Sequence, residues 1–269
     1  MSDVIPVSVE WLSVREEADA HSRSRPLARK AARMTRAPIV VHDLGSGTGS
    51  MMRWLAPLLP GPQTWVLHDW NHVLLDHAAQ RASDSTGHPA VVRTSVRDVG
   101  HLRESDFAGA SLITMSALLD VLSDEEVGSI VAACVAAGAP ALFALSVTGR
   151  VDLEPFDPGD RVFESAFNDH QRRTSTGRRL LGPDAVTTAI DLFRAAGWSV
   201  RADDAPWRLD ASQPELVAEW LEGWVAAAVE ERPALEEWGD EYLRTRRMQL
   251  ADGALSVVVH HKDLLAWPS

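Results

Sequence analysis

Three glycines at alternating positions are the first residues in this sequence whose spacing suggests chemistry. Gly45, Gly47 and Gly49 stand in VHDLGSGTGSMMRW, after an apolar run that ends at Asp43 and before a segment with helical character. Glycine lets a backbone turn tightly and approach a ligand, and a glycine-rich turn between a strand and a helix is typical of nucleotide-binding sites. The stretch therefore predicts a turn that binds a nucleotide-like cofactor.

Two common nucleotide motifs do not fit this turn. The GxGxxG motif of nicotinamide and flavin enzymes needs a third glycine at position 50, where Ser50 stands, and a P-loop needs a lysine that is missing. What remains is DLGSGTG (residues 43–49), which resembles motif I, [DE]-x-G-x-G-x-G, of the class I S-adenosylmethionine-dependent methyltransferases. The resemblance covers roughly residues 38–150 and 184–262, and it implies S-adenosylmethionine as cofactor and S-adenosylhomocysteine as product.

The resemblance also assigns acidic residues after the next two strands. Asp69 would hold both ribose hydroxyls, because a carboxylate can accept two hydrogen bonds. Asp98 would bind the adenine amino group, with the Val99 amide facing a ring nitrogen and Trp70 flanking the ring. Three plainer roles stay open: Asp69 as a helix N-cap, Asp98 as an exposed loop acid, and Trp70 as a packing residue.

Four further residues complete the predicted cofactor set. Ser46 belongs to the turn, and Ser116 ends the fourth strand. Asp43 is expected behind the turn, where it orders the backbone or contacts the methionine end through water. Arg23 shares a four-residue spacing with Arg15 and Asp19, so that these three side chains lie on one helix face. They are candidates for contact with the cofactor carboxylate or the acceptor, although surface ion pairing explains the same spacing.

The methyl acceptor is expected to lie under parts of the chain outside this core. Within the segment 150–183, His170 is the candidate general base, because an imidazole titrates near neutral pH. Asn168, Arg172 and Arg173 stand beside it, and the arginines could bind a substrate carboxylate or phosphate. A solvent-exposed or capping histidine and solvated loop arginines are the alternatives. Near the N-terminus, Trp11 lines the pocket or anchors the cap.

Several classes of function are disfavoured. The stretch after the fourth strand, MSALL (115–119), lacks the two prolines of the [DNS]-P-P-[YF] motif of adenine and amide methyltransferases. A formal charge of −12, with 38 acidic and 26 basic residues, opposes nucleic-acid binding. No distinctive carboxylate cluster is visible, and His260 with His261 has no third ligand nearby, so we expect no metal.

The elements that must position these residues alternate between strand and helix from residue 38 onward. Residues 8–36 read as helical, with an interruption near Pro26. Strands are expected at 38–44, 63–70, 89–96, 110–116, 140–147, 198–209 and 253–267, and helices at 50–59, 71–82, 123–138, 185–197, around Trp220 and Trp224, and at 234–249. This alternation predicts an α/β fold, a Rossmann-like doubly wound sheet of seven strands, mostly parallel with an antiparallel last strand.

The organisation follows from this pattern. Residues 1–37 form an N-terminal helical cap, and residues 38–269 form the core, interrupted by a substrate-side insertion at 150–183 and a helical insertion at 210–250. No apolar run is long enough to span a bilayer, no secretory signal is visible, and the one cysteine, Cys134, forms no intrachain disulfide. We expect a cytoplasmic protein, a monomer or a homodimer.

The preferred interpretation is a metal-independent methyltransferase that forms an O-, N- or C-methyl bond on a small molecule. The Ala-, Arg- and Asp-rich composition resembles that of actinobacterial chains, which favours specialised metabolism by analogy. The alternatives are a protein or RNA methyltransferase, a non-catalytic cofactor-binding scaffold, and a cyclase or other atypical use of the sulfonium.

Overall fold

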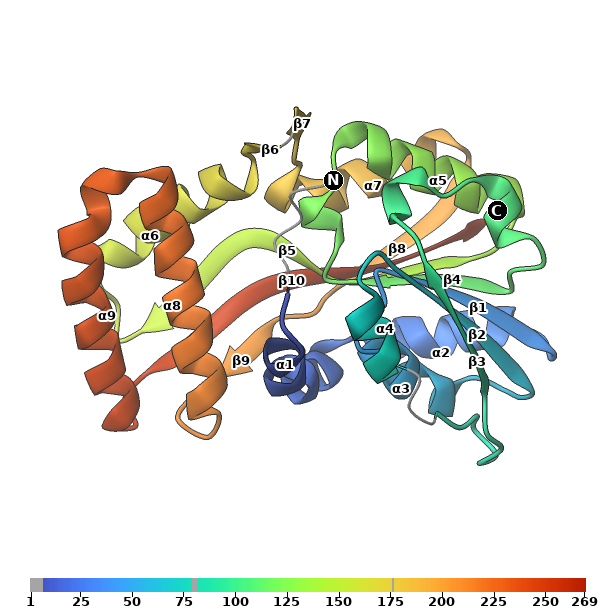
Figure 1. Ribbon diagram of the computed structural model, residues 1–269, viewed down its shortest axis with the longest axis horizontal. Coiled ribbons are helices and arrows are strands. Elements are labelled where there is room, and N and C mark those ends of the chain that lie inside the picture. The colour runs from blue at the N-terminus through green and yellow to red at the C-terminus, as the bar shows by residue number, and fades with distance from the viewer. Residues whose placement is uncertain (1–6, 79–81, 176) are drawn as a thin grey trace.

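A twisted seven-stranded β-sheet runs through the centre of the computed structural model (Figure 1). The structure describes residues 7–78, 82–175 and 177–269. The sheet order is β3-β2-β1-β4-β5-β10-β8. The strands are β1 (Ile39–Leu44), β2 (Gln63–Asp69), β3 (Val91–Val96), β4 (Leu112–Ser116), β5 (Ala141–Glu154), β8 (Trp198–Asp204) and β10 (Ser256–Pro268).

The strand directions confirm the predicted sheet. The first five strands are parallel, whereas β10 is antiparallel to both of its neighbours, β5 and β8. A short strand, β9 (Trp207–Leu209), adds to β10, with Leu209 opposite Val257. Because the parallel strands share one direction, Leu44, Asp69 and Ser116 end at the same edge of the sheet.

Helices cover both faces of this sheet. One face carries α2 (Arg25–Met34), α3 (Ser50–Leu55) and α4 (His72–Ala78), and the other carries α5 (Asp124–Ala137) and α7 (Ala185–Ala195). The central strands β1 and β4 are almost wholly buried, as expected for a parallel sheet covered on both faces. The Ser123–Glu126 capping box at the start of α5 is present as predicted.

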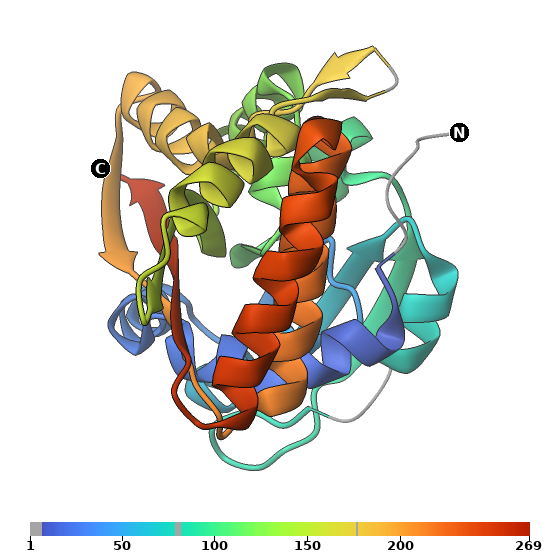
Figure 2. The same cartoon turned by 90° about the vertical axis from the view of Figure 1, so that its left-hand side faces the viewer.

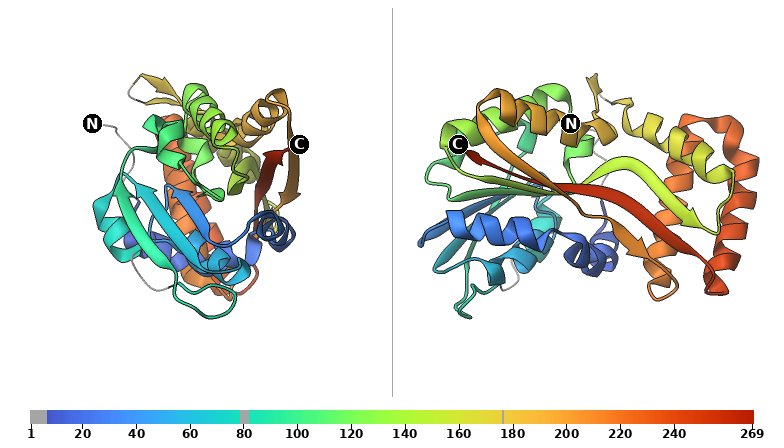
Figure 3. Two further views of the ribbon diagram at one scale, coloured as in Figure 1. Left: turned by 90° about the vertical axis from the view of Figure 1, so that its right-hand side faces the viewer. Right: turned by 180° about the vertical axis from the view of Figure 1, so that it is seen from behind.

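A second group of helices packs on the far ends of β5 and β10, at the left of Figure 1. It consists of α6 (Gly159–Gln171), α8 (Pro214–Glu231) and α9 (Glu236–Ala251), and Figure 2 views it face on. Phe163, Trp224 and Tyr242 meet at its centre. We call this group, with β9 and the far ends of β5 and β10, the helical lobe. Figure 3 shows the two long strands crossing from the core into it.

The N-terminal helical segment is two helices, α1 (Val9–Ser22) and α2, and the break lies before the proline. Ser24 caps α2 by accepting from the Leu27 amide, and Pro26 occupies the first turn, where no amide hydrogen is needed. The predicted helix 50–59 ends as α3 at Leu55 and continues as a 3-10 turn, Ala56–Leu58. The predicted helix 71–82 is helical from His72 to Ala78, and residues 79–81 lie outside the described residues.

The prediction for the segment from residue 150 was wrong in its first part. β5 does not stop near residue 147 but continues to Glu154, because β10 offers it a partner as far as Ser256. The helix α6 follows, and then β6 (Thr174–Ser175) pairs with β7 (Arg178–Arg179). The predicted strand 198–209 is likewise two strands, which separate at Ala205 and Pro206. Among the described residues, no helix is both long enough and apolar enough to cross a membrane.

Candidate active site

A cavity of about 370 Å³ opens at the carboxyl ends of β1, β2 and β4. It is lined by every residue predicted to bind the cofactor except Gly49, namely Arg23, Asp43, Gly45, Ser46, Gly47, Asp69, Trp70, Asp98, Val99 and Ser116. We call it the cofactor cavity. Gly49 lies behind it, in the left-handed region with φ of 82°, where it begins α3 close to Ala78.

The glycine turn needs glycine for two physical reasons. Gly45 and Gly47 have φ of 60° and 53°, a conformation that residues with a Cβ rarely adopt. A Cβ on Gly45 would lie 2.5 Å from the Leu118 side chain. The alternating glycines thus let the backbone form one wall of the cavity.

Asp69 connects the second strand to this turn. Its carboxylate accepts from the Gly47 amide at 2.9 Å and from the Asn71 amide at 2.9 Å. The side chain therefore supports the turn and the start of α4 together, so the capping interpretation and a place at the cavity are compatible. Each oxygen keeps a further lone pair for a ligand. Burial raises the pKa of Asp69 above its usual value, against the lowering effect of these backbone hydrogen bonds.

Asp43 lies deeper, behind the turn. The Thr114 hydroxyl donates to its Oδ1 at 2.7 Å, and its Oδ2 has no partner among the described residues. Burial raises the pKa of Asp43 to about 7. The Ser46 hydroxyl in the same wall is also buried and unpaired within the described chain. Buried polar groups are usually hydrogen-bonded, so these atoms indicate a polar ligand.

Arg23 supplies a buried positive charge at the edge of this cavity. Its Nη2 donates to Ser50 Oγ at 2.9 Å and to Ser116 Oγ at 3.0 Å, and its nearest carboxylate, that of Asp19, is 3.8 Å away. Burial lowers its pKa below the usual value for arginine, and no described residue pairs with its Nε. An incompletely paired buried guanidinium is suited to bind a carboxylate.

The residues predicted to hold adenine come from the loops after β2 and β3. Asp98 begins a 3-10 turn, Val99–His101, and its carboxylate accepts from the Gly100 amide at 3.0 Å. Val99 is buried, and Trp70 is 45% exposed, so its ring is available to a ligand. These residues border the cofactor cavity together.

A second cavity, of about 180 Å³, lies between the core and the helical lobe. Its wall is rich in aromatic side chains, and it includes Trp11, Phe167, Trp207, Trp220 and Trp224. We call it the aromatic cavity. Arg15 and Ala117 border both cavities. Ala117 and Leu145, which lines the aromatic cavity, have positive φ of 51° and 55°, a strained conformation that recurs at functional sites.

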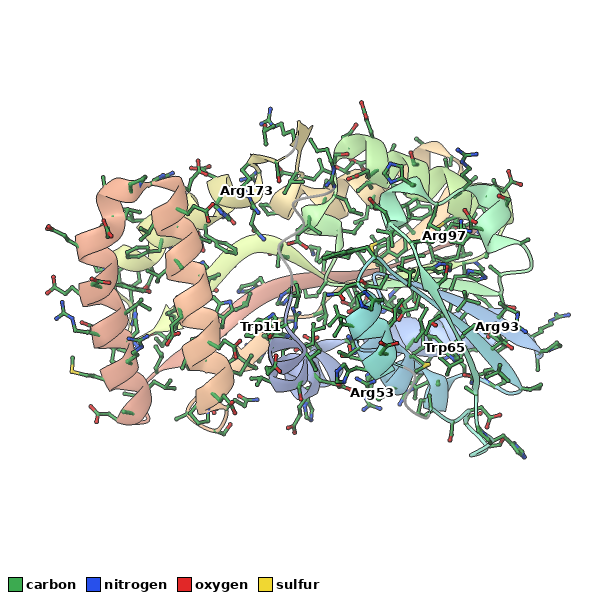
Figure 4. The ribbon with its side chains drawn as sticks, viewed as in Figure 1. Trp11, Arg53, Trp65, Arg93, Arg97 and Arg173 are labelled. Atoms are coloured by element: carbon green, nitrogen blue, oxygen red, sulfur yellow. The ribbon has the colours of Figure 1, made fainter. Side chains whose placement is uncertain are left out.

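The residues predicted to bind the acceptor do not all lie in the same cavity. Trp11, Arg15 and Asn168 line the aromatic cavity, whereas Asp19 and Arg173 line the cofactor cavity. Figure 4 shows Trp11 and Arg173 on opposite sides of the long strands in this view. Arg15 donates to the Asp19 carboxylate from two nitrogens, and its guanidinium lies 4.8 Å from the Trp207 ring centre. The ion pair expected as an alternative is thus present, and it stands at the cavity wall.

His170 and Arg172 line neither cavity. The His170 ring is buried between α6 and α8, with Nε2 3.2 Å from the Glu230 carboxylate and Nδ1 3.2 Å from Arg173 Nη1. Arg172 pairs with Asp184 at 2.6 Å. The geometry thus gives both side chains partners that stabilise the lobe and the loop after it.

Sequence reasoning missed much of the aromatic cavity. Asp120, Gln171 and His261 line it, along with three tryptophans from β9 and α8. A signal existed for α8, because Trp220 and Trp224 are four residues apart and share one helix face. No described group of three His, Cys, Asp or Glu side chains could hold a metal ion.

No protein-family profile and no curated protein sequence matches the chain. Solved structures do resemble it. The YcgJ protein from Bacillus subtilis has 13% identity and a TM-score of 0.50, over 91% of this chain and 97% of that one. The cyclopropane synthase MmaA2 from Mycobacterium tuberculosis has 12% identity and a TM-score of 0.47, over 98% and 100%. Magnesium protoporphyrin IX methyltransferase from Synechocystis, with bound S-adenosylhomocysteine, has 14% identity and a TM-score of 0.46, over 74% and 82%.

At such low sequence identities, similarity to a solved structure is evidence for a shared fold only. The strand order, the antiparallel β10 and the N-terminal helices together define that fold independently of any single relative. The chain has a Rossmann-like α/β fold, in which a mostly parallel sheet has an antiparallel strand, β10, between β5 and β8.

Proposed function

We propose that this protein transfers a methyl group from S-adenosylmethionine to a small-molecule acceptor. The observation that carries the proposal is the meeting of two different cavities at Arg15 and Ala117. One cavity has a glycine turn and polar side chains at the carboxyl ends of parallel strands, where this fold class binds its ligands. The other is mostly apolar and encloses a space of small-molecule size.

The residues of the cofactor cavity fit the cofactor in shape and in donor set. Gly45 and Gly47 carry no side chain, so the backbone of the turn borders the cavity directly. Asp43 Oδ2, Ser46 Oγ and Arg23 Nε are buried without a partner in the described residues, and they carry the acceptors and donors that a zwitterionic amino acid needs.

Each side chain then has a distinct part in binding. Arg23 would pair with the methionine carboxylate, and Asp69 would accept from the ribose hydroxyls. Asp98 and the Val99 amide would hold the adenine edge, with Trp70 against its face. Bound there, the cofactor would supply an activated methyl group, so that the protein's main task is to hold an acceptor in line with it and exclude water.

The acceptor is proposed to be a small molecule, methylated at oxygen, nitrogen or carbon in specialised metabolism. An aromatic cavity of only about 180 Å³ supports a small molecule over a protein or RNA segment. The formal charge of −12 supports the same choice against RNA.

Calorimetric titration with S-adenosylmethionine and S-adenosylhomocysteine, with NADH as control, tests the proposal. We expect micromolar binding of the first two and none of NADH. Formation of S-adenosylhomocysteine with an acceptor then separates an enzyme from a non-catalytic scaffold. Absence of binding by both sulfur ligands would refute the proposed function.

A further inference from the structure

One carboxylate lines the aromatic cavity among the described residues, and it is that of Asp120. It belongs to a 3-10 turn, Leu119–Val121, three residues after Ala117, where the two cavities meet. No described arginine or lysine forms an ion pair with it, and the Gln171 amide donates to its Oδ2 at 3.2 Å. A half-buried carboxylate that senses the Arg15 charge but forms no ion pair is costly, which makes it a functional candidate.

The same cavity holds other polar atoms that lack partners. Gln171 Oε1, Asn168 Oδ1, Trp224 Nε1 and His261 Nδ1 are buried, and no described group pairs with them. All four side chains line the aromatic cavity. Because buried polar groups are normally hydrogen-bonded, the cavity suits a ligand that carries its own donors and acceptors.

The walls of the cavity favour a flat ring. Trp220 and Trp224 stack with ring centres 5.2 Å apart, and Trp11 meets Trp207 edge-on at 6.4 Å. An open groove continues outward from the cavity and shares Trp11, Phe167, Trp220 and Trp224 with it. Aromatic side chains on several sides gain most from contact with another planar π-system.

We propose that the aromatic cavity binds a planar aromatic acceptor with a hydroxyl or amino group, and that Asp120 receives the proton of that group. The inference rests on the proposed function. The acceptor heteroatom bonds to the methyl carbon as the carbon–sulfur bond breaks, and sulfur keeps the electron pair. The proton that the heteroatom loses passes to the Asp120 carboxylate, so atoms and charge balance.

The electrostatics of the cavity support this role. Burial raises the pKa of Asp120, which makes its carboxylate a stronger proton acceptor. Facing groups are Arg15 on α1, Arg150 on β5, and His260 and His261 on β10. Burial lowers the pKa of His261 to about 4, so this imidazole stays neutral near pH 7. His260 and Arg150 each pair with Asp152 at 2.8 Å.

Binding of a matched pair of probes tests the acceptor class. The full-length protein, saturated with S-adenosylhomocysteine, is titrated with 2-naphthol and with decahydro-2-naphthol, which keeps the hydroxyl but is not planar. We expect at least tenfold tighter binding of 2-naphthol. Trp220→Leu should weaken that binding about tenfold, and Trp238→Leu, on α9 outside both cavities, should leave it within twofold. Equal affinities, or no effect of Trp220→Leu, would overturn the inference.

Fluorescence of bound 2-naphthol tests the role of Asp120, because excited naphthol gives its proton to a nearby carboxylate and then emits as naphtholate. Excitation beyond the tryptophan band should give naphtholate emission with the wild-type protein and with Asp191→Asn, an exposed control on α7. Asp120→Asn should restore emission from the neutral form. Asp120→Ser serves if Asp120→Asn no longer binds S-adenosylhomocysteine. Neutral emission from the wild type, or naphtholate emission from the variant, contradicts the proposal.

These outcomes separate the two proposals. If S-adenosylhomocysteine does not bind, the proposed function falls and the acceptor role with it. If S-adenosylhomocysteine binds and 2-naphthol does not, only the present inference falls.

Discussion

The cofactor cavity and the aromatic cavity are built in different ways. The first centres on a glycine turn and strand ends within residues 43–122, with further lining residues from the N-terminal segment and from residues 173–180. The second is made by large side chains from α1, β5, α6, β9, α8 and β10, which are spread from Trp11 to His261. Short local motifs thus form most of one cavity, whereas the other depends on contacts that only folding brings together.

The largest effect should come from breaking the helical lobe without touching the cofactor cavity. Arg246 is fully buried, donates to Asp160 and to the Pro155 carbonyl, and Tyr242 shares the Asp160 carboxylate. Arg246→Met leaves that carboxylate buried without a cation. We expect a loss of about 3–5 kcal/mol in the free energy of unfolding by urea.

Ligand binding by Arg246→Met tests whether the two cavities are independent. Binding of 2-naphthol should weaken more than tenfold, whereas S-adenosylhomocysteine should bind within twofold of the wild type. Arg247→Ala is the control, because its pair with Glu222 is half exposed and should contribute less than about 1 kcal/mol. An equal loss of both ligands would show that the two cavities are not independent.

Protonation of two buried histidines at low pH should reduce the folding stability of the core that carries the cofactor cavity. His42 Nδ1 and His68 Nε2 are 3.0 Å apart in the buried sheet, and burial lowers both pKa values, that of His68 to about 4. A histidine with a lowered pKa in the folded state contributes stability that is complete above about pH 6.5. That stability is lost as the pH falls from about 6.5 toward 4.

The contribution of His42 and His68 to the free energy of unfolding should fall by about 2–3 kcal/mol over this pH range, measured by urea unfolding at several pH values. Asp43 and Asp263, with pKa values raised to about 7 and about 6, titrate with the opposite sign, so the variant must be compared with the wild type. The double variant His42→Leu, His68→Leu should reduce the slope of stability with pH. His77→Leu, exposed on α4, should keep it. An unchanged slope in the double variant would exclude the pair as its source.

A smaller effect, confined to the cofactor cavity, is expected from Asp69→Ala. This change removes the proposed acceptor for the ribose hydroxyls and the support of the Gly47 amide. Affinity for S-adenosylmethionine should fall by about 1–3 kcal/mol, roughly 5- to 150-fold, in calorimetry. Asp76→Ala, exposed on α4, is the matched control. Unchanged affinity in Asp69→Ala would remove Asp69 from the site.

The smallest effect should come from His170→Ala. The ring contacts Glu230 and Arg173 but lines neither cavity, so its loss should affect ligand binding less than the changes above. Binding of S-adenosylhomocysteine and of 2-naphthol should stay within twofold, and so should turnover once an acceptor is known. A collapse of turnover with both affinities intact would instead make His170 the base.

The sheet and the cofactor cavity could be predicted because their signals are local. The glycine turn, the strand that precedes it and the carboxylates Asp69 and Asp98 each stand within a few residues of one predicted strand end. The rule that parallel strands end at one edge then brings them together without any knowledge of packing.

The aromatic cavity could not be predicted in the same way. His170 stands in the densest group of functional side chains in its segment, yet α6 turns it toward α8. Asp120 could not be singled out from the sequence, because nothing near it in the chain shows that Trp207 and His261 come to the same cavity. The far half of β5 was missed because its pairing depends on β10, more than 100 residues later.

The position of β9 has a consequence for how such a protein diversifies. Leu209 and Val257 are direct partners, so the chain leaves and re-enters the sheet at one point around α8 and α9. A hairpin of helices whose two ends meet can be lengthened, shortened or exchanged without altering the course of the strands. Since Trp220 and Trp224 are carried by that hairpin, replacing this one module can change the lining of the aromatic cavity while the cofactor cavity stays unaltered.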